Sequence, residues 1–403
     1  MSHVMYVFIS MTDYIFLVLA LLFSLCMLES AGSEQPQPVN SRSFFTTPEE
    51  HYEKIRFISS QISSRSRGTK VSLKRSQSEG HCPRPLSYKS LATQVDIADM
   101  KRALSVEDIV PDNLPHDFSS TEVTAVADVQ AMMSMEDLVD FLLPQGLIPA
   151  IVPEFKGITI GGSIQGLAAE SSSFKYGFVH DAIESFEVIL GDGRVITCSN
   201  TSNADLFYGL PGTFGTLGII TRVRVYCLRA DPYVQISCVK HESVESCIDY
   251  MGRIQDGILG NPSESKCDFL EGLGFDNDHI VSVAAKFCSL DEYQVLLNKN
   301  PILGSHFNIF RRCNKLGHKW FFNQIRDFTS LSTLAKIMTK IPQHELGVII
   351  MPTKDYLFRH DRGSFWMASY RIPQSIGLFM GRLLGKMMSI AIYFSLSLGL
   401  LEI

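Results

Sequence analysis

A stretch rich in glycine, alanine and serine, at residues 153–181, has the residue types that bind a phosphate-bearing ligand. Gly161, Gly162 and Gly166 have no Cβ, so a ligand can lie close against their backbone N–H groups. Consecutive N–H groups in such a loop form a concave anion site, and a pyrophosphate would satisfy it. A tight turn between a strand and a helix uses glycine equally well without a ligand, so these glycines alone leave both interpretations open.

The residues that follow predict the elements that would position this loop. Residues 183–190 alternate apolar and polar side chains as a half-buried strand does, and a Gly-Asp-Gly turn leads to a second strand at 194–198. Residues 203–208 predict a short helical turn, and a second glycine-rich loop follows at 209–218. The β-branched residues at 219–225 predict a further strand, so two glycine loops flank one strand pair.

The order of these motifs resembles the FAD-binding domain of flavoproteins of the vanillyl-alcohol-oxidase type. The motifs are TIGGSIQG at 159–166, ESSSFKYG at 170–177, DLFY at 205–208 and GTLGIIT at 215–221. Within that superfamily, ESSSFKYG and DLFY are similar to sequences of the Delta(24)-sterol reductase family. An ordered set of this kind is far more specific than one glycine motif. The resemblance covers residues 149–225 well and the flanking residues more loosely.

The resemblance implies that both loops hold FAD, bound noncovalently. Backbone N–H groups of residues 159–171 and the hydroxyls of Ser163 and Ser171 would hold the pyrophosphate, and residues 215–219 would lie against the ribityl and ring parts. Lys175 and Tyr176 would orient the loop or reach phosphate, the alternative for Lys175 being a solvated side chain. The cofactor-binding residues expected on this basis are Thr159, Ile160, Gly161, Gly162, Ser163, Gly166, Leu167, Ala168, Ala169, Glu170, Ser171, Lys175, Tyr176, Gly177, His180, Gly215, Gly218 and Ile219.

His180 is expected only as a neighbour of this site. Some flavoproteins of the type bond a histidine to the flavin, whereas the sterol reductases hold FAD noncovalently. A capping or core histidine is the alternative interpretation. For Phe214 and Tyr208, core packing is the preferred interpretation and stacking on the flavin is the alternative.

The reaction that the sterol reductase resemblance implies is reduction of a C=C bond in the sterol side chain. It needs a hydride from reduced flavin and a proton from an acid on the other side of the bond. The part of the protein that covers the substrate must supply that acid. His360, between Arg359 and Asp361, is the expected catalytic acid by residue type, and an arginine-flanked surface loop is the alternative. NADPH is the expected transient electron donor.

Three function classes stay open on the sequence. The first is an FAD-dependent oxidoreductase that reduces a sterol side chain with electrons from NADPH. The second is an FAD-linked oxidase or dehydrogenase of another apolar alcohol or hydroxy acid. The third is an inactive relative that binds FAD or nothing.

Composition favours a globular chain of two domains and gives little support to other partners. The chain has 403 residues, of which 45% are hydrophobic and 19% charged, enough for a substantial core. A net charge of −6 gives no support for nucleic-acid binding. The 9 cysteines form no CxxC pair and no cluster with metal-ligand spacing, so reduced thiols and no metal are expected.

The apolar run at residues 14–28 indicates a membrane or secretory segment. It is shorter than the roughly 20 residues of a spanning helix and matches the apolar region of a signal peptide. No lysine or arginine precedes it, and Glu29 fits a cleavage site before Ala31 poorly, which favours an uncleaved anchor. The resemblance implies an N-terminal membrane helix, so the endoplasmic reticulum membrane is the expected location and a sterol the expected lipid partner.

The expected fold class is α+β: a two-subdomain FAD-binding domain of the vanillyl-alcohol-oxidase type, followed by an α+β substrate cap that looks C-terminally truncated. The expected divisions are an anchor or signal at 1–31, a linker at 32–47, the FAD-binding domain at 48–229 and the cap at 230–403. The apolar end of the chain, at 387–401, has no family counterpart. A membrane-contacting helix, a buried helix and a wrong gene-model end compete there, and the last is favoured.

Inside the first domain, hydrophobic periodicity and capping residues predict the remaining elements. Ile55 and Ile58 share one face of the first helix, and Ser134 caps the second. Residues 74–82 stand where the first phosphate loop is expected, with a solvated basic turn as the alternative. The elements expected are helices at 48–60 and 135–143, strands at 69–73, 94–97 and 122–127, and an irregular charged stretch at 101–120.

The expected cap elements are more loosely defined. The sequence predicts strands at 232–239, 268–272 and 279–287, and a helix at 243–258. Val244, Cys247, Ile248 and Met251 have helical spacing on that helix. The aromatic run at 319–322 and the segment 356–366 resemble the family's cap more weakly than the flavin loops resemble its FAD-binding domain.

Overall fold

The structure is a computed structural model whose described residues form three β-sheets and the helices that accompany them. Among the described residues, no helix combines the length and the apolar character that crossing a membrane requires. The predictions for 14–28, 75–82, 362–366 and 387–401 fall outside the described residues. The residues described are 44–66, 68–74, 91–109, 122–257, 267–299, 320–330 and 348–361.

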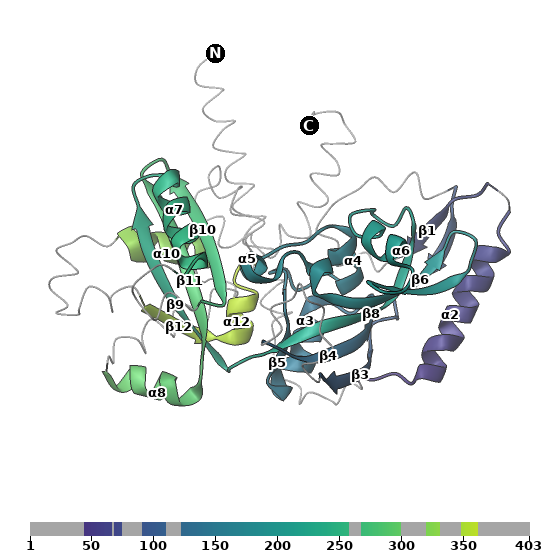
Figure 1. The fold of residues 1–403 in the computed structure, drawn as a ribbon, viewed down its shortest axis with the longest axis horizontal. Coiled ribbons are helices and arrows are strands. Elements are labelled where there is room, and N and C mark those ends of the chain that lie inside the picture. The colour runs from purple at the N-terminus through teal and green to yellow at the C-terminus, as the bar shows by residue number, and fades with distance from the viewer. Residues whose placement is uncertain are drawn as a thin grey trace, which may run out of the picture. The chain divides into compact units, whose positions relative to one another are not determined.

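A six-stranded sheet carries both glycine loops (Figure 1). Its strand order is β3-β4-β8-β6-β7, and β5 pairs with β8 beside this path. All of these neighbours are antiparallel, and the long β8 pairs with both β4 and β6. The strands are β3 (Ala103–Asp108), β4 (Val123–Gln130), β5 (Leu147–Pro149), β6 (Ile183–Leu190), β7 (Val195–Ser199) and β8 (Gly218–Arg229).

The predicted hairpin is confirmed, because β6 and β7 pair across the Gly-Asp-Gly turn. The prediction of an irregular stretch is wrong for residues 103–108, which form β3 at the edge of the sheet. Charged side chains suit an edge strand, which keeps one side open to solvent. Glu107 pairs with Arg224 of β8 at 3.1 Å, so charge here accompanies strand pairing.

The predicted first helix is confirmed as α2 (Pro48–Ser63), which begins with a capping box formed by Thr47 and Glu50. Its buried face carries Ile55, Ile58 and Ile62, as helical spacing requires. These side chains share a core cluster with residues of the two-stranded parallel sheet and of the large sheet. The two parallel strands are β1 (Val71–Lys74) and β2 (Thr93–Asp96), close to the predicted ranges.

The short helices of the first half lie where the direction of the backbone has to change. Ser134 caps α3 (Met135–Leu142), and Gly146 takes a left-handed φ of 72° after the 3₁₀ turn Leu143–Gln145. The remaining short helices are α4 (Ile160–Gln165), α5 (Ser173–Tyr176), the 3₁₀ turn η4 (Val179–Ala182) and α6 (Ala204–Gly209). The expected order of strand, helix and glycine-rich loop is therefore present.

A second, four-stranded antiparallel sheet follows, in the order β10-β11-β9-β12 (Figure 1). Helices and strands are thus mixed in both halves, and the α+β fold class is confirmed. The strands are β9 (Tyr233–His241), β10 (Phe269–Asp276), β11 (His279–Cys288) and β12 (Val348–Pro352). The helices are α7 (Val244–Gln255), α8 (Leu290–Lys299), α10 (Phe321–Ser330) and α12 (Thr353–Leu357).

The predicted helix at 243–258 is confirmed as α7, but its predicted apolar face is partly wrong. Cys247 and Ile254 are buried, with Met251 packed beside them. Val244 and Ile248 are 54% and 64% exposed. Helical spacing alone allows more than one row of apolar side chains on α7. Only the position of the sheet determines which row is buried.

Candidate functional site

The first glycine loop begins at α4, and its backbone donors are used within the protein itself. Thr159 is the N-cap of α4, and its Oγ1 accepts from the N–H of Gly162 at 3.1 Å. The N–H of Gly161 donates to the carbonyl oxygen of Ala131 at 2.9 Å. The next donors along the loop, at residues 163 and 166–168, also bond to oxygens of this segment. An anion here would need donors other than these N–H groups.

Close packing against neighbouring residues explains three of the predicted glycines. A Cβ at Gly161 would lie 2.9 Å from Cβ of Ala131, and one at Gly218 would lie 2.5 Å from Cγ1 of Val188. A Cβ at Gly162 would lie 2.9 Å from Oγ1 of Thr159. These positions need glycine whether or not a ligand is present, so their substitution does not test ligand binding by itself.

Gly215 in the second loop differs from these three. Its φ of 82° favours glycine, and no atom of the described residues lies within 4 Å of the place that a Cβ would take there. Two neighbouring non-glycine residues are also left-handed, Leu167 at 53° and Phe214 at 52°. Their side chains are 44% and 63% exposed. The loops therefore present exposed apolar side chains at the positions where the backbone conformation is unfavourable.

Buried polar atoms without a hydrogen-bond partner gather on the same segment. Among the described residues they include Nε2 of Gln165, Oε1 of Glu170 and Nδ1 of His180. Each such atom costs about 1–3 kcal/mol unless a ligand or water pairs with it. FAD carries phosphate, hydroxyl and ring groups that donate and accept hydrogen bonds, so the residues present fit this cofactor.

The other predicted cofactor residues divide into exposed and buried sets. Gly166 and Ala169 are exposed and Ala168 is half-buried, whereas Ile160 and Ser163 are buried. Ser163 Oγ donates to the carbonyl oxygen of Ile160 at 2.7 Å. Ile219 is a core residue packed with α2, which explains its type without a cofactor.

Lys175 and Tyr176 bond to acidic side chains. Nζ of Lys175 lies 3.3 Å from Oδ1 of Asp268 and 3.6 Å from Oε1 of Glu122. The hydroxyl of Tyr176 hydrogen-bonds to Glu122, and burial with this neighbouring charge raises the pKa of Tyr176. Neither side chain is the solvated group of the alternative interpretation, and Lys175 links the loop to the residue preceding β10.

Gly177 and His180 belong to a compact turn. Gly177 has a φ of 76°, and a Cβ there would collide with the carboxylate of Asp181. That carboxylate accepts from the N–H of Phe178 at 2.7 Å. The His180 ring stacks on Phe178 at 5.6 Å, and its Nε2 lies 3.6 Å from Oδ1 of Asp181. His180 is thus held by the turn, with Nδ1 buried and unpaired among the described residues.

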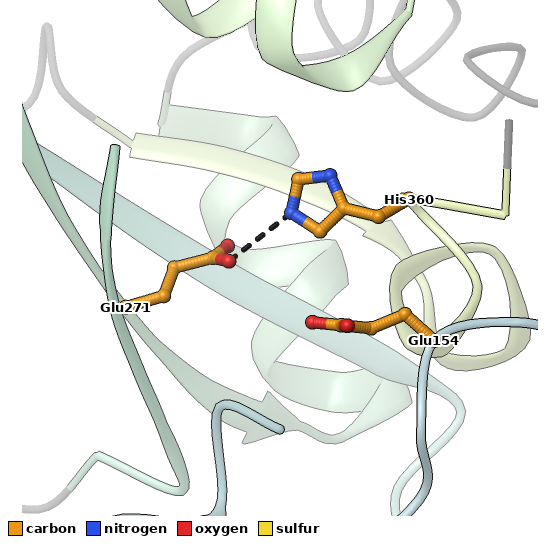
Figure 2. A group of neighbouring side chains, drawn as sticks. All are labelled: Glu154, Glu271 and His360. Atoms are coloured by element: carbon orange, nitrogen blue, oxygen red, sulfur yellow. Dashed lines mark hydrogen bonds and ion pairs between the residues drawn. The ribbon is translucent and has the colours of Figure 1, made fainter. Parts of the chain in front are cut away.

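A second group of polar side chains lies where the end of α12 meets β10. Figure 2 shows His360 pointing at Glu271, with Glu154 beside them. Nε2 of His360 lies 3.1 Å from Oε2 of Glu271. The His360 side chain is 16% exposed, so it is not the surface residue of the alternative interpretation. The predicted acid therefore has a part-buried carboxylate partner.

Arg359 joins this pair to Ser171, in the glycine- and serine-rich stretch at residues 153–181. Its side chain is 1% exposed and donates to Oε1 of Glu271 at 2.9 Å. It also donates to Oε1 of Glu154 at 3.3 Å and to Oγ of Ser171 at 3.0 Å. The guanidinium lies over the ring of Tyr356 at 4.2 Å. One buried cation thus satisfies two carboxylates and a predicted cofactor residue.

Ser171 bonds to both halves of the protein. Its carbonyl oxygen accepts from the N–H of Leu270 in β10 at 2.8 Å, and its hydroxyl donates to Oε2 of Glu170 at 2.7 Å. With the bond from Arg359, three contacts fix this residue. The predicted cofactor residues Glu170 and Ser171 and the predicted acid His360 are therefore brought into one neighbourhood.

The pKa values of two carboxyl groups in this neighbourhood, those of Glu271 and Glu170, are shifted in opposite directions. Burial opposes ionisation of Glu271, but the charges and hydrogen bonds of Arg359 and His360 outweigh it and hold its pKa well below the usual range. Burial raises the pKa of Glu170, the charge of Glu154 adds to this, and its serine partners and Arg359 do not offset it. Glu271 is thus ionised, and Glu170 favours the neutral acid.

Glu154, Glu271 and His360 are also residue types that ligate metals. Their ligand atoms lie within 4.8 Å of one another. Arg359 already supplies a positive charge to both carboxylates at hydrogen-bonding distance. A divalent cation would have to displace this buried guanidinium, so the group is better explained as an arginine-centred ion cluster.

Four residues of these sites were not predicted. Glu154, Glu271 and Arg359 lie in three separate segments, and no local pattern marks any of them. Gln165 lies inside the recognised TIGGSIQG motif, but nothing in the sequence marks its amide as functional. Only Arg359 had an indirect signal, as the residue next to the predicted acid.

Comparison with known proteins confirms the expected FAD-binding domain. Residues 77–199 match the family model described as FAD binding domain. The match covers the first glycine loop and ends at the last residue of β7. An FAD-binding domain is therefore present in this protein.

Several relatives are similar over longer stretches. The Delta(24)-sterol reductase of Mus musculus is 25% identical over 248 residues, covering 62% of this chain and 42% of the relative. The Delta(24)-sterol reductase of Pisum sativum is 24% identical over 367 residues, covering 89% of this chain and 58% of the relative. Cytokinin dehydrogenase 8 of Oryza sativa subsp. indica is 30% identical over 186 residues, covering 45% of this chain and 32% of the relative. The chain thus spans between about a third and three fifths of these relatives.

Proposed function

We propose that this protein is an FAD-dependent oxidoreductase that reduces a C=C bond in the side chain of a sterol with electrons from NADPH. The similarity to sterol reductases from mouse and pea supports the substrate class. The observation that carries the proposal is the set of bonds from Arg359 to Ser171 and Glu271, because it joins the FAD-binding segment to the His360–Glu271 pair. The first supplies a cofactor site and the second a proton donor.

FAD, when bound, supplies hydride transfer. The protein must then supply a proton to the second carbon of the reduced bond. Nε2 of His360 faces the Glu271 carboxylate, so its N–H is held there. The transferable proton is the one on Nδ1, because Nε2 is the nitrogen that Glu271 engages. Glu271 fixes the orientation of the ring through this bond and acts as a positioning residue.

Arg359 contributes order and water exclusion. Its guanidinium is 1% exposed and pairs with the part-buried carboxylates of Glu154 and Glu271, where limited solvent strengthens their attraction to it. Its bond to Ser171 keeps the flavin loop and the end of α12 at a fixed separation. A misplacement of about 1 Å costs on the order of a hundredfold in rate, so this fixed separation serves the proton transfer.

The same proposal covers attachment and location. FAD is held noncovalently, with His180 as a neighbour, and the protein acts at the endoplasmic reticulum membrane through its apolar N-terminal segment. Acid precipitation tests attachment: the flavin is expected in the supernatant. A yellow pellet carrying flavin on His180 would contradict noncovalent binding.

Product analysis tests the reaction. The full-length protein is loaded with FAD and incubated with NADPH and a sterol that carries the side-chain alkene, in ordinary water and in D₂O. The expected product is the saturated sterol, with at least one deuterium in D₂O, since the proton comes from an exchangeable group. Absence of product from the FAD-loaded protein would overturn the reductase proposal.

A second candidate is an FAD-linked oxidase or dehydrogenase of another apolar substrate, such as an alcohol or hydroxy acid. The 30% identity to a cytokinin dehydrogenase over 186 residues favours keeping it. Anaerobic mixing separates the two candidates. NADPH is expected to bleach the flavin absorbance of a reductase. Bleaching by an oxidisable substrate, and none by NADPH, would favour the dehydrogenase.

A further inference from the structure

Gln165, the last residue of α4, joins the two glycine-rich loops. Its Oε1 accepts from the N–H of Gly215 at 2.8 Å and lies 2.9 Å from the hydroxyl of Thr213. These partners are 50 and 48 residues away in the sequence. The side chain of one loop thus holds the backbone of the other.

These partners fix the orientation of the amide. A backbone N–H can only donate, so the group of Gln165 that faces Gly215 has to be the carbonyl oxygen. The hydroxyl of Thr213 also reaches the carbonyl oxygen of Leu210 at 2.7 Å, and either choice of its partner leaves the amide as it is. Nε2 therefore points away from the second loop.

Nε2 of Gln165 is buried and has no hydrogen-bond partner within the described part of the protein. Other glutamine amides of the same domain are paired: Nε2 of Gln145 donates to the carbonyl oxygen of Phe141 at 2.7 Å, and Nε2 of Gln130 lies 3.1 Å from Nδ1 of His51. A buried amide donor without an acceptor is unfavourable, and such atoms are rare in native structures. An acceptor from outside the described residues is therefore expected at this atom.

The surroundings of Gln165 match a ligand with both acceptors and flat apolar surface. Leu167 and Phe214 are left-handed and keep exposed apolar side chains, and a Cβ at Gly212 would lie 2.9 Å from Cδ1 of Leu167, so the loops touch. Gly215 leaves open space at the same point. Left-handed non-glycine backbone is unfavourable by about 1 kcal/mol or more and recurs at ligand sites.

We propose that Gln165 is a cofactor-binding residue with two functions. Its Oε1 holds the second glycine loop against the first, and its Nε2 donates to an acceptor oxygen of FAD that lies between the loops. The inference rests on the proposed function, in which FAD is the cofactor. It adds a side-chain donor to a segment whose N–H groups at residues 161–163 and 166–168 are already bonded internally.

Gln165→Glu separates the two functions. The carboxylate keeps an acceptor for Gly215 and Thr213 and replaces the donor by a second acceptor. We expect the Kd for FAD to rise by roughly 10- to 100-fold, the range that corresponds to a buried hydrogen bond lost to an unpaired acceptor. The measurement is titration of the FAD-free full-length protein with FAD, followed by flavin fluorescence. Gln145→Glu is the matched control, because Gln145 donates to its own helix, and it should leave this Kd unchanged.

Two results would overturn the inference. One is wild-type FAD affinity in Gln165→Glu, while the wild-type protein binds FAD. If Gln165→Glu does not fold, as judged by circular dichroism, Gln165→Met is titrated instead, and wild-type affinity there is the second. Failure of the wild-type protein to bind FAD is a different outcome, since it overturns the proposed function and the inference together.

Discussion

Two histidine–glutamate pairs, one buried and one part-buried, stand in different parts of the molecule, and they differ in what the second ring nitrogen contacts. Nε2 of His51 lies 2.9 Å from Oε1 of Glu187, and Nε2 of His360 lies 3.1 Å from Oε2 of Glu271. Nδ1 of His51 is occupied by the amide of Gln130 at 3.1 Å. Within the described residues, Nδ1 of His360 has no such partner. We call the His51–Glu187 pair closed, because both ring nitrogens have partners, and the His360–Glu271 pair open, because its Nδ1 has none in the described part of the chain.

The surroundings of His51 fix its proton. Oε1 of Gln130 accepts from the N–H of Arg102 at 3.1 Å, so the amide nitrogen faces His51 and Nδ1 has to accept. The ring N–H therefore lies on Nε2 and donates to Glu187, which also accepts from Thr221 at 2.7 Å. His51 is 0% exposed. This pair joins α2 to three strands and has no atom left for chemistry.

The two glutamates also differ in the charges around them. Burial opposes ionisation of both, and hydrogen bonds from His51 and Thr221 lower the pKa of Glu187. The charge of Arg222 adds to this at Glu187, whereas Glu271 is hydrogen-bonded directly to the buried Arg359, which holds its pKa well below the usual range. A full charge beside the open pair keeps its carboxylate ionised. The two pairs thus differ in the second ring nitrogen and in the adjacent guanidinium, and this difference supports the proposal of His360 as the proton donor.

Removing the cation should have the largest effect. Arg359→Met leaves the part-buried Glu154 and Glu271 without their cation, and we expect the free energy of unfolding to fall by about 3 kcal/mol. Urea denaturation measures it. Arg194→Met is the control, because the Arg194 side chain is 71% exposed in its pair with Asp192 and should contribute less than about 1 kcal/mol. Equal losses in the two variants would contradict a special function for the buried cluster.

Removing the open nitrogen should affect rate and leave stability nearly unchanged. Glutamine at position 360 can still donate to Glu271 but cannot transfer a proton from Nδ1. For His360→Gln we expect turnover to fall by roughly 100-fold, equivalent to about 2.7 kcal/mol, with FAD affinity unchanged. Product formation and FAD titration are the measurements. Wild-type turnover in this variant would exclude His360 as the proton donor.

Removing the ring of His51 from the closed pair should lower stability and leave the rate unchanged. His51→Ala leaves Glu187 and Gln130 without their ring partner, and we expect a loss of about 2 kcal/mol in the free energy of unfolding. Turnover per folded molecule should not change, since the pair is structural. The measurements are urea denaturation and product formation under conditions where the variant is folded. A rate loss in fully folded His51→Ala would show that the closed pair also serves catalysis.

The smallest effect concerns the neutral acid beside the open pair. The folded-state pKa of Glu170 is raised by burial, so its contribution to stability is fully present below the ordinary value near 4.5 and is lost as pH rises through the raised pKa. Glu170→Gln has no proton to lose. The wild type should therefore lose stability relative to Glu170→Gln when the pH is raised from about 4.5 to a second value well above it, by on the order of 1 kcal/mol. Parallel urea curves at the two pH values would contradict a raised pKa.

The sequence by itself determined the elements whose signals are local. The hairpin of β6 and β7 follows from alternation and a Gly-Asp-Gly turn, and α2 follows from capping and the spacing of its isoleucines. The ordered glycine motifs identified the FAD-binding domain, which the family match at residues 77–199 confirms. These features can be read from the sequence because each depends on residues a few positions apart.

The tertiary structure alone decided what those residues contact. Gly161 and Gly218 face Ala131 and Val188 of the same protein, so glycine there reflects packing as much as any ligand. Arg359 meets Glu271, Ser171 and Glu154 across 88, 188 and 205 residues. No pattern of spacing encodes such distances, because side chains far apart in sequence are brought together only when the two sheets and their loops have folded. The candidate site therefore depends on long-range contacts between segments that the sequence could identify only separately.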